Sequence, residues 1–267
     1  MSPTVTVLMR VYNAERHLRA AVESALAQTF TDFELLAVDD GSTDASVAIL
    51  ESYGDPRIRV VTQRNGGRNA AARRGLAEAR GRYVAILDAD DRAAPERLAR
   101  QVATLENDPD LVMVGSALGV VDERGTRIGV RRYPLDDAAL RRAVTIYNPF
   151  GNSTLTYRCD AARAAGGYDL TTFCEDWDLS LRLMKRGRVA NLPDVLSDYR
   201  VRTDRIDRRL VKMLLRGSIA ARSAAHCLYG FPRTPASVAV DSAQRALCLA
   251  PPDLANWICF RLFYRGA

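Results

Sequence analysis

Lysine, histidine and cysteine are scarce in this chain of 267 residues. Its two histidines, His17 and His226, lie far apart in the sequence, so we assign them no catalytic or metal-binding role. The five cysteines are scattered, odd in number and without a Cys-x-x-Cys pair. This pattern excludes a zinc ribbon or a disulfide framework and indicates a reducing compartment.

Long apolar runs are also missing. Residues 111–121 form an apolar run about half as long as the ~20 residues that a membrane-spanning helix needs. A strand pattern begins directly after Met1-Ser2-Pro3, so we expect no signal peptide and predict a cytoplasmic protein. The hydrophobic content of 48% and the charged content of 26% are typical of a soluble globular protein.

The net charge of +6 is carried almost wholly by arginine, because Lys185 and Lys212 are the only lysines. Arginine suits a bidentate grip on phosphate, although most of these side chains have the ordinary explanation of a solvated surface. A basic chain also raises the hypothesis of nucleic-acid binding. Because no groove-reading motif is present, we expect no nucleic-acid partner.

Strand and helix patterns alternate through the first half of the chain. The predicted strands are residues 5–9, 33–38, 58–62 and 82–87. The predicted helices are residues 14–28, 44–53, 69–79 and 96–106. This alternation predicts an α/β fold with a Rossmann-like, mainly parallel sheet flanked by helices, which binds its ligand at the carboxyl ends of the strands.

The pattern changes after residue 110. Strands are predicted at residues 111–114, 118–121 and 195–201, with a turn at 123–125 and an extended segment at 153–157. Helices are predicted at residues 136–144 and 175–185. Beyond Arg202 we predict two or three helices over residues 204–264, interrupted at Phe231-Pro232 and Pro251-Pro252.

Acids follow two of the predicted strands. Asp88-Ala89-Asp90-Asp91 ends the fourth, and two carboxylates one residue apart on a rigid strand end suit a hard cation that carries a diphosphate. Taken alone, this motif is more often a solvated acidic turn. Asp39-Asp40 precedes Gly41 after the second strand, where an aspartate can accept hydrogen bonds from a nucleobase or ribose. A capped turn would need only the glycine and a following Ser or Thr.

Three further places carry candidate site residues. Tyr12 follows the first strand, where a tyrosine stacks on a base about as often as it packs in the core. Arg68 stands beside a helix N-terminus after a Gly-Gly pair, which suits phosphate but also fits an ordinary loop. Glu175-Asp176-Trp177-Asp178 opens a helix, where acids are favoured by the macrodipole. The tryptophan between these acids suggests a shaped pocket with a general base.

The ordered set of these motifs resembles the family-2 inverting nucleotide-sugar glycosyltransferases over about residues 4–201. The segments that carry the resemblance are residues 7–13, 28–30, 33–34, 39–44, 88–91, 166–168 and 175–179. The resemblance implies a GT-A fold, a nucleotide-diphospho-sugar donor, a divalent metal (Mn or Mg) and transfer with inversion to a glycan or lipid-linked acceptor.

Carried over residue by residue, the resemblance implies Asp176 as the catalytic base with Glu175 in support. The implied nucleotide contacts are Tyr12, Asp39, Arg68, Asp88 and Ala89, the implied metal ligands are Asp90 and Asp88, and the implied acceptor contacts are Trp177 and Asn152. The implied domain covers residues 1–202, with a nucleotide-binding half of about residues 1–110 and an acceptor half of about residues 111–202. We predict a helical C-terminal extension over residues 203–267.

The chain departs from the family pattern at three places. Arg10 stands where many relatives carry proline, and Asn152 stands where many carry histidine. In the helix after the third strand, the arginine and asparagine that relatives often carry stand at other positions in this chain. Arg68 and Arg73 are therefore both candidates to bind the diphosphate.

Two alternative functions and a surface role of the C-terminal residues remain to be weighed. A catalytically inactive sugar-nucleotide-binding module is the main alternative, and the intact Asp176 speaks against it. A nucleotidyltransferase would need a glycine-rich loop near the N-terminus, which residues 5–13 lack. Basic residues interleaved with apolar ones follow Arg202, and residues 257–264 are apolar and aromatic. These features suit peripheral attachment to the inner face of the membrane, or a homo-oligomer contact.

Overall fold

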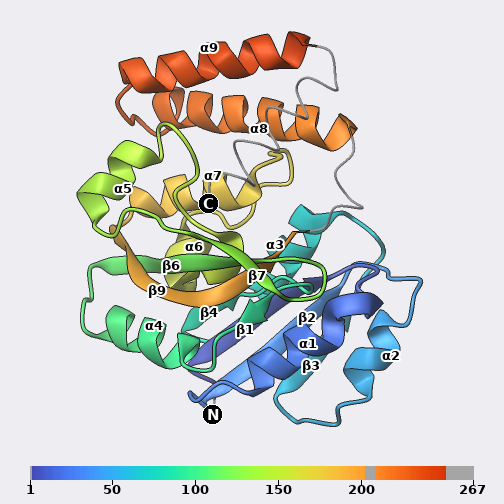
Figure 1. Cartoon of the computed structure of the whole chain (residues 1–267). Coiled ribbons are helices and arrows are strands. Elements are labelled where there is room, and N and C mark those ends of the chain that lie inside the picture. Colours follow the sequence, from blue (N-terminus) through green and yellow to red (C-terminus); the bar gives the residue numbers. More distant parts are fainter. Residues whose placement is uncertain (1, 202–207, 251–267) are drawn as a thin grey trace.

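The computed structural model describes residues 2–201 and 208–250, in which a nine-stranded sheet carries helices on both faces (Figure 1). The strand order is β3-β2-β1-β4-β8-β6-β9-β5, and β7 pairs with β6. The strands are β1 Val5–Val11, β2 Phe33–Asp39, β3 Ile58–Thr62, β4 Tyr83–Ile86, β5 Arg92–Ala93, β6 Leu111–Val121, β7 Arg127–Arg131, β8 Thr156–Arg158 and β9 Arg188–Arg200.

The first half of the sheet is parallel, as the alternating pattern predicts. β1 lies between β2 and β4, β3 pairs with β2, and all three pairings are parallel. Beyond β4 the sheet is mixed. β8 runs antiparallel between β4 and β6, β7 and β5 pair antiparallel with β6 and β9, and β6 and β9 are parallel. A short turn can connect antiparallel neighbours such as β6 and β7, which need no helical crossover.

The helices lie on both sides of this sheet, and each side has an apolar core. The helices are α1 Glu15–Leu26, α2 Ser46–Glu51, α3 Arg68–Glu78, α4 Arg97–Glu106, α5 Asp137–Ala143, α6 Cys159–Ala164, α7 Glu175–Met184, α8 Arg208–Cys227 and α9 Pro235–Leu249. Helices α1, α2 and α4 share one core with Val7 and Met9 of β1. Helices α3, α5, α6 and α7 share the other with Leu8. The alternation along β1 is that of a strand covered on both faces.

Three predictions in the second half of the chain differ from the structure. The strands predicted at residues 111–114 and 118–121 are one strand, β6, because Gly115 gives room to a neighbour rather than ending the strand. A Cβ there would lie 2.2 Å from Asn191 Oδ1 on β9. β9 begins at Arg188 rather than at residue 195. The segment predicted to be extended begins with a 3-10 turn, Asn152–Thr154, before the short β8.

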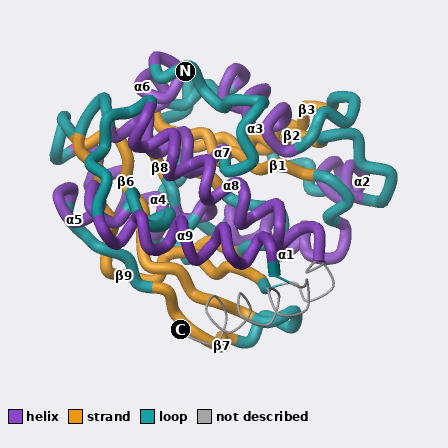
Figure 2. The backbone as a smooth tube through the Cα atoms, turned by 90° about the horizontal axis from the view of Figure 1, so that it is seen from above, coloured by secondary structure: helices purple, strands orange, loops and turns teal. Residues whose placement is uncertain are grey.

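Helices α8 and α9, the described part of the C-terminal extension, stack on the side of the sheet that carries α7. Figures 1 and 2 both show α8 beside α9, with α8 next to α7. The predicted interruption at Phe231-Pro232 is confirmed, since α8 ends at Cys227 and α9 begins at Pro235. The predictions that concern Arg202, Pro251-Pro252 and the aromatic residues 257–264 lie outside the described residues. In the two described ranges, no helix combines the length and the apolar character needed to cross a bilayer.

Candidate active site

The carboxyl ends of β1 and β4 bring Arg10 and Asp88 together. Leu8 pairs with Ile86 across these parallel strands, so Arg10 and Asp88 each lie two residues further along on the same face. Arg10 Nη2 lies 2.6 Å from Asp88 Oδ1. This is the face on which α7 packs, so the register of the sheet places a cation and an acid beside the start of α7.

Arg10 also pairs with Glu175, the first residue of α7, through an Nη1–Oε1 distance of 2.7 Å. The second carboxylate oxygen, Oε2, lies 3.0 Å from Nη2 of Arg68, whose guanidinium is 4.7 Å from the centre of the Phe173 ring. Burial of the Arg10 guanidinium opposes its charge. The carboxylates of Asp88 and Glu175 outweigh this burial and raise the pKa of Arg10 well above its ordinary value.

Asp176 follows Glu175 in the first turn of α7 and is partly exposed. Asn148 Nδ2 donates a hydrogen bond to Asp176 Oδ2 over 3.0 Å. Burial and the neighbouring charge of Glu175 raise the pKa of Asp176 to about 6. A carboxylate with this pKa can accept and release a proton near neutral pH, which is what a general base requires.

The two residues predicted to contact an acceptor occupy different surroundings. Trp177 is 3% exposed and belongs to the apolar core, and its indole Nε1 has no hydrogen-bond partner within the described chain. This enclosure favours a packing role over direct contact with an acceptor. Asn152 Nδ2 donates to Asp88 Oδ2 over 2.9 Å, so this side chain lies beside Asp88.

Asp39 stands at the end of β2 with one carboxylate oxygen engaged and one unpaired. The N–H groups of Gly41 and Ser42 donate to Oδ2 over 3.2 and 3.1 Å. Oδ1 is buried and has no hydrogen-bond partner among the residues described. A buried acceptor of this kind favours an incoming N–H or O–H donor. Tyr12, which is 49% exposed, follows Val11, the residue that pairs with Asp39 across the strands.

Asp40 holds the glycine loop that precedes Arg68. Its carboxylate accepts hydrogen bonds from the N–H groups of Gly66 and Gly67 over 2.9 and 2.8 Å. Gly67 has a φ of 85°, a conformation that favours glycine because it lacks a Cβ. The two acids before Gly41 therefore have separate surroundings. Asp39 offers an unpaired oxygen, and Asp40 fixes the loop that places Arg68.

The turn after β4 concentrates negative charge. Asp90 is partly exposed, whereas the side chain of Ala89 is buried in the core that contains α1. Burial and the charges of Asp88 and Asp90 raise the pKa of Asp91 well above its ordinary value. Asp91 lies under the turn and accepts hydrogen bonds from Ser153 Oγ over 2.5 Å and from a backbone N–H of β9 over 2.9 Å.

A divalent cation fits this turn if other ligands come from a substrate. In the part of the chain that the structure describes, no three acids, histidines or cysteines are grouped as a metal site. Hard cations such as Mg²⁺ are commonly held by one or two carboxylates together with substrate phosphates and water. Asp90 offers such a carboxylate. Asp88 can join it through lone pairs left over from its bonds to Arg10 and Asn152, so the turn suits a cation that takes its other ligands from a diphosphate.

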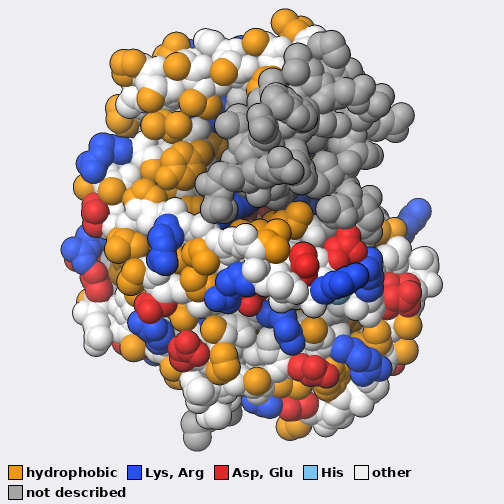
Figure 3. Space-filling model, viewed as in Figure 1, with side chains coloured by type: hydrophobic (Ala, Val, Ile, Leu, Met, Phe, Trp, Pro, Cys, Tyr) orange, Lys and Arg blue, Asp and Glu red, His pale blue; other side chains and the backbone are white. Residues whose placement is uncertain are grey.

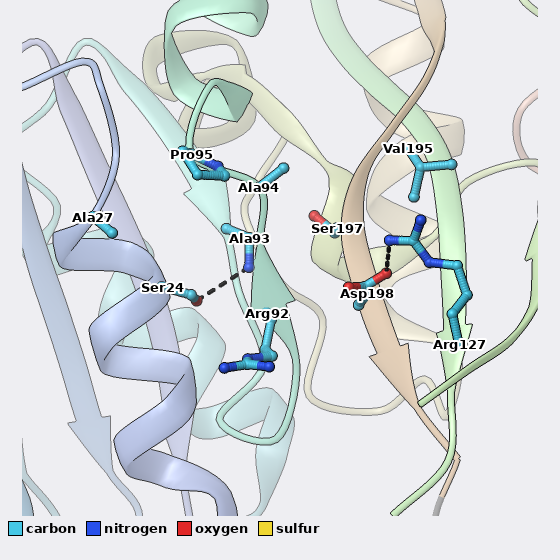
Figure 4. Close-up of a pocket in the computed structure, with 10 residues that line it drawn as sticks. All are labelled: Ser24, Ala27, Arg92, Ala93, Ala94, Pro95, Arg127, Val195, Ser197 and Asp198. Carbon is cyan, nitrogen blue, oxygen red and sulfur yellow. Dashed lines mark hydrogen bonds and ion pairs between the residues drawn. The ribbon is translucent and has the colours of Figure 1, made fainter. Parts of the chain in front are cut away.

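A surface pocket of about 390 Å³ lies between α1, β5 and β9 (Figure 4). Two of its side chains form an ion pair, with Arg127 Nη2 2.6 Å from Asp198 Oδ1. Ser24 Oγ accepts a hydrogen bond from the Ala93 N–H over 3.1 Å. The pocket shares no lining residue with the cluster around Arg10.

Arg10 departs from a family pattern in the sequence, and its contacts with Asp88 and Glu175 are seen only in the structure. Its signal was the alternation along β1, because Arg10 follows Leu8 on the face that packs against α7. The contact of Asn148 with Asp176 carried no comparable signal, since it joins a loop to a helix.

This chain is similar to known glycosyltransferases. The family model described as glycosyl transferase family 2 matches residues 6–165. The amylovoran biosynthesis glycosyltransferase AmsE of Erwinia amylovora is 33% identical over 76% of this chain and 79% of its own. The putative glycosyltransferase EpsE of Bacillus subtilis is 37% identical over 76% of this chain and 74% of its own.

Two solved structures share the fold. S. aureus TarS 1-349 in complex with UDP has a TM-score of 0.65 and 18% identity, over 98% of this chain and 73% of that one. The mannosyltransferase PcManGT from Pyrobaculum calidifontis, in complex with GDP-Man and Mn²⁺, has the same TM-score and identity over 99% of this chain and 82% of that one. The predicted GT-A fold is confirmed.

Replacing Arg10 with methionine should lower the free energy of unfolding by about 3 kcal/mol, because Asp88 and Glu175 would lose their shared cation. Urea unfolding at pH 7 measures this loss. Arg74→Met is the matched control, since Arg74 pairs with Glu78 on the exposed surface of α3 and should contribute about 0–1 kcal/mol. Equal losses in the two variants would contradict the central place of Arg10.

Proposed function

Because this chain belongs to glycosyl transferase family 2, we propose that it is an inverting glycosyltransferase with Asp176 as its general base. The donor is a nucleotide-diphospho-sugar, and the acceptor is a hydroxyl group of a glycan or lipid-linked glycan. The observation that carries this proposal is the position of Asp176. It has a pKa of about 6 and follows Glu175, which Arg10 ties to Asp88.

The proposed reaction is a single displacement. Asp176 takes the proton of the acceptor hydroxyl while the acceptor oxygen forms a bond to the anomeric carbon of the sugar. The bond from that carbon to the phosphate oxygen breaks, and the nucleoside diphosphate leaves with the bonding electrons. Attack on the face opposite the leaving group inverts the configuration. Asn148 holds the Asp176 carboxylate in place through its hydrogen bond to Oδ2.

The proposed donor site follows the strand ends. Asp39 presents its unpaired Oδ1 to a donor group of the nucleoside, and Tyr12 offers an exposed ring for the base. Arg68, which is held near Glu175, meets the diphosphate. The complexes of TarS with UDP and of PcManGT with GDP-Man support a nucleotide ligand for this fold.

A divalent cation, Mn²⁺ or Mg²⁺, would be held by Asp90 and Asp88, with the backbone at Ala89 close to the nucleotide. When bound, such an ion supplies positive charge that stabilises the leaving diphosphate. The Mn²⁺ in the PcManGT complex supports a divalent cation in this fold. Among the chain's own residues, Asn152 and Arg10 hold the Asp88 carboxylate in a fixed orientation.

The relative named for amylovoran biosynthesis supports a role in polysaccharide biosynthesis, and we propose that the product is a surface polysaccharide, a glycolipid or a related glycan. Attachment of the C-terminal extension to the inner face of a membrane, or to a second copy, stays a prediction. Apolar side chains gather over α8 and α9 in the upper part of Figure 3. The exposed large ones on or beside these helices are Met213, Leu214, Leu228, Val238 and Leu249.

Asp176→Asn should lower kcat by at least about 100-fold, because an amide cannot take the acceptor proton. The nucleotide affinity should stay within about twofold of the wild type, since Asp176 is not among the predicted nucleotide contacts. A transfer assay and calorimetry with nucleoside diphosphates measure the two effects. Wild-type turnover in this variant would refute the base assignment.

Asp90→Asn should remove most of the gain in nucleoside diphosphate affinity that Mn²⁺ gives the wild type, because an amide oxygen binds a hard cation more weakly than a carboxylate. Calorimetry of UDP and GDP binding, with and without Mn²⁺, measures this gain. Asp110→Asn, at the exposed start of β6, is the control. The metal assignment fails if Mn²⁺ raises the affinity equally in all three proteins.

The rate should depend on pH through Asp176, which acts only when ionised. With a pKa of about 6, kcat/KM should fall as the pH drops through 6. Glu175→Gln removes a negative charge that raises this pKa, so the acid limb should move to lower pH. Glu78→Gln, on α3, should leave the limb in place, because Glu78 is partly buried and pairs with Arg59 and Arg74 rather than with residues of the site. A limb that stays at the same pH in Glu175→Gln would contradict Asp176 as the titrating base.

A further inference from the structure

The helix that carries Asp176 begins without a cap of its own. Cys174 stands at the N-cap of α7, and its side chain makes no capping hydrogen bond. Glu175, Asp176 and Asp178 crowd the first turn, where their charges repel one another although the macrodipole favours each. The position of this turn therefore depends on contacts from other parts of the chain. Some come from the arginines at Glu175, and others come from α8.

Gly217 brings the backbone of α8 against the residues that precede α7. A Cβ at this buried position would lie 2.8 Å from Phe173 Cδ1 and 2.9 Å from Cys174 Sγ, which is closer than real side chains allow. Glycine inside a helix costs about 1 kcal/mol relative to alanine, and here the close approach accounts for it. Ala221 and Ala225, one and two turns further along α8, are buried in the core that contains α7.

Two polar side chains of the extension contact the next residues of α7. Arg222, which is 1% exposed, lies with its guanidinium 5.9 Å from the centre of the Trp177 ring. Its Nε is held by Asp241 Oδ1 of α9 at 2.6 Å. Tyr229 Oη donates a hydrogen bond to Asp178 Oδ1 over 2.7 Å. The extension thus contacts α7 on both sides of Asp176.

We propose that the α8–α9 extension positions the Asp176 carboxylate, with Gly217, Arg222 and Tyr229 as positioning residues. This inference rests on the proposed function and deepens it. Asp39 and Asp88 stand at strand ends of the sheet, whereas Arg68 stacks on Phe173 beside Gly217. A change at Tyr229, which contacts Asp178, should therefore lower kcat while leaving donor binding nearly intact.

Gly217→Val tests the proposal in the full chain. Its side chain must push Phe173 and Cys174 away, and a misplaced base lowers the rate steeply, so kcat should fall by about tenfold or more. Because Arg68 stacks on the Phe173 ring, this variant should also weaken nucleoside diphosphate binding. The split between kcat and donor binding is therefore measured in Tyr229→Phe, whose hydroxyl contacts Asp178. Ala220→Val is the matched control, because it adds the same β-branched side chain to the same helix at an exposed position.

Two milder variants keep the test valid if Gly217→Val folds poorly. Gly217→Ala adds only the Cβ and should lower kcat less than valine does. Tyr229→Phe removes a single hydroxyl from Asp178 and should lower kcat by about two- to tenfold, the range of an ordinary hydrogen bond. Melting temperatures of all variants show whether a loss of rate reflects unfolding.

The outcomes separate this inference from the proposed function. If Gly217 and Tyr229 variants match Ala220→Val in kcat, or raise the donor KM at unchanged kcat, the extension does not position the base. Asp176→Asn is assayed beside them. Full activity in that variant would overturn the proposed function itself, whereas its inactivity beside fully active Gly217 variants would overturn the positioning role alone.

Discussion

The candidate active site depends on one cation, Arg10, that the carboxylates of Asp88 and Glu175 share. Arg10 is largely enclosed, and an enclosed charge is stable only when it is paired. Its partners come from the turn after β4 and from the start of α7, which are far apart in the sequence. The pairing therefore requires the sheet to be in register and α7 to be docked before the charges are satisfied. Folding and the proposed catalytic geometry are therefore coupled through this one side chain.

The parallel half of the fold could be predicted from the sequence because its signals are local. β3 has the predicted bounds, and β1, β2 and β4 differ from prediction by one or two residues at their ends. The second half depends on distant neighbours. Gly115 is typical of a strand break, but Asn191 of β9 occupies the space that its missing side chain leaves. No pattern within β6 reveals this contact.

The site shows the same division. Residue type and position along the chain singled out Asp39 and Asp88 at strand ends and Asp176 at the start of a helix. Sequence assigned no role to Asp40, because only the fold shows that its carboxylate holds the Gly66-Gly67 loop. The acceptor contact of Trp177 stays a prediction, and packing encloses the ring.

The short strand β8 has a consequence for how the chain is made. β8 spans Thr156–Arg158 and pairs with both β4 and β6, so it joins the parallel half of the sheet to the rest. During synthesis β4 has an open edge until β8 leaves the ribosome, although β1 to β4 already exist. An open strand edge readily pairs with other chains. Until β8 is made, the β4 edge of the nascent chain is therefore open to pairing with other chains.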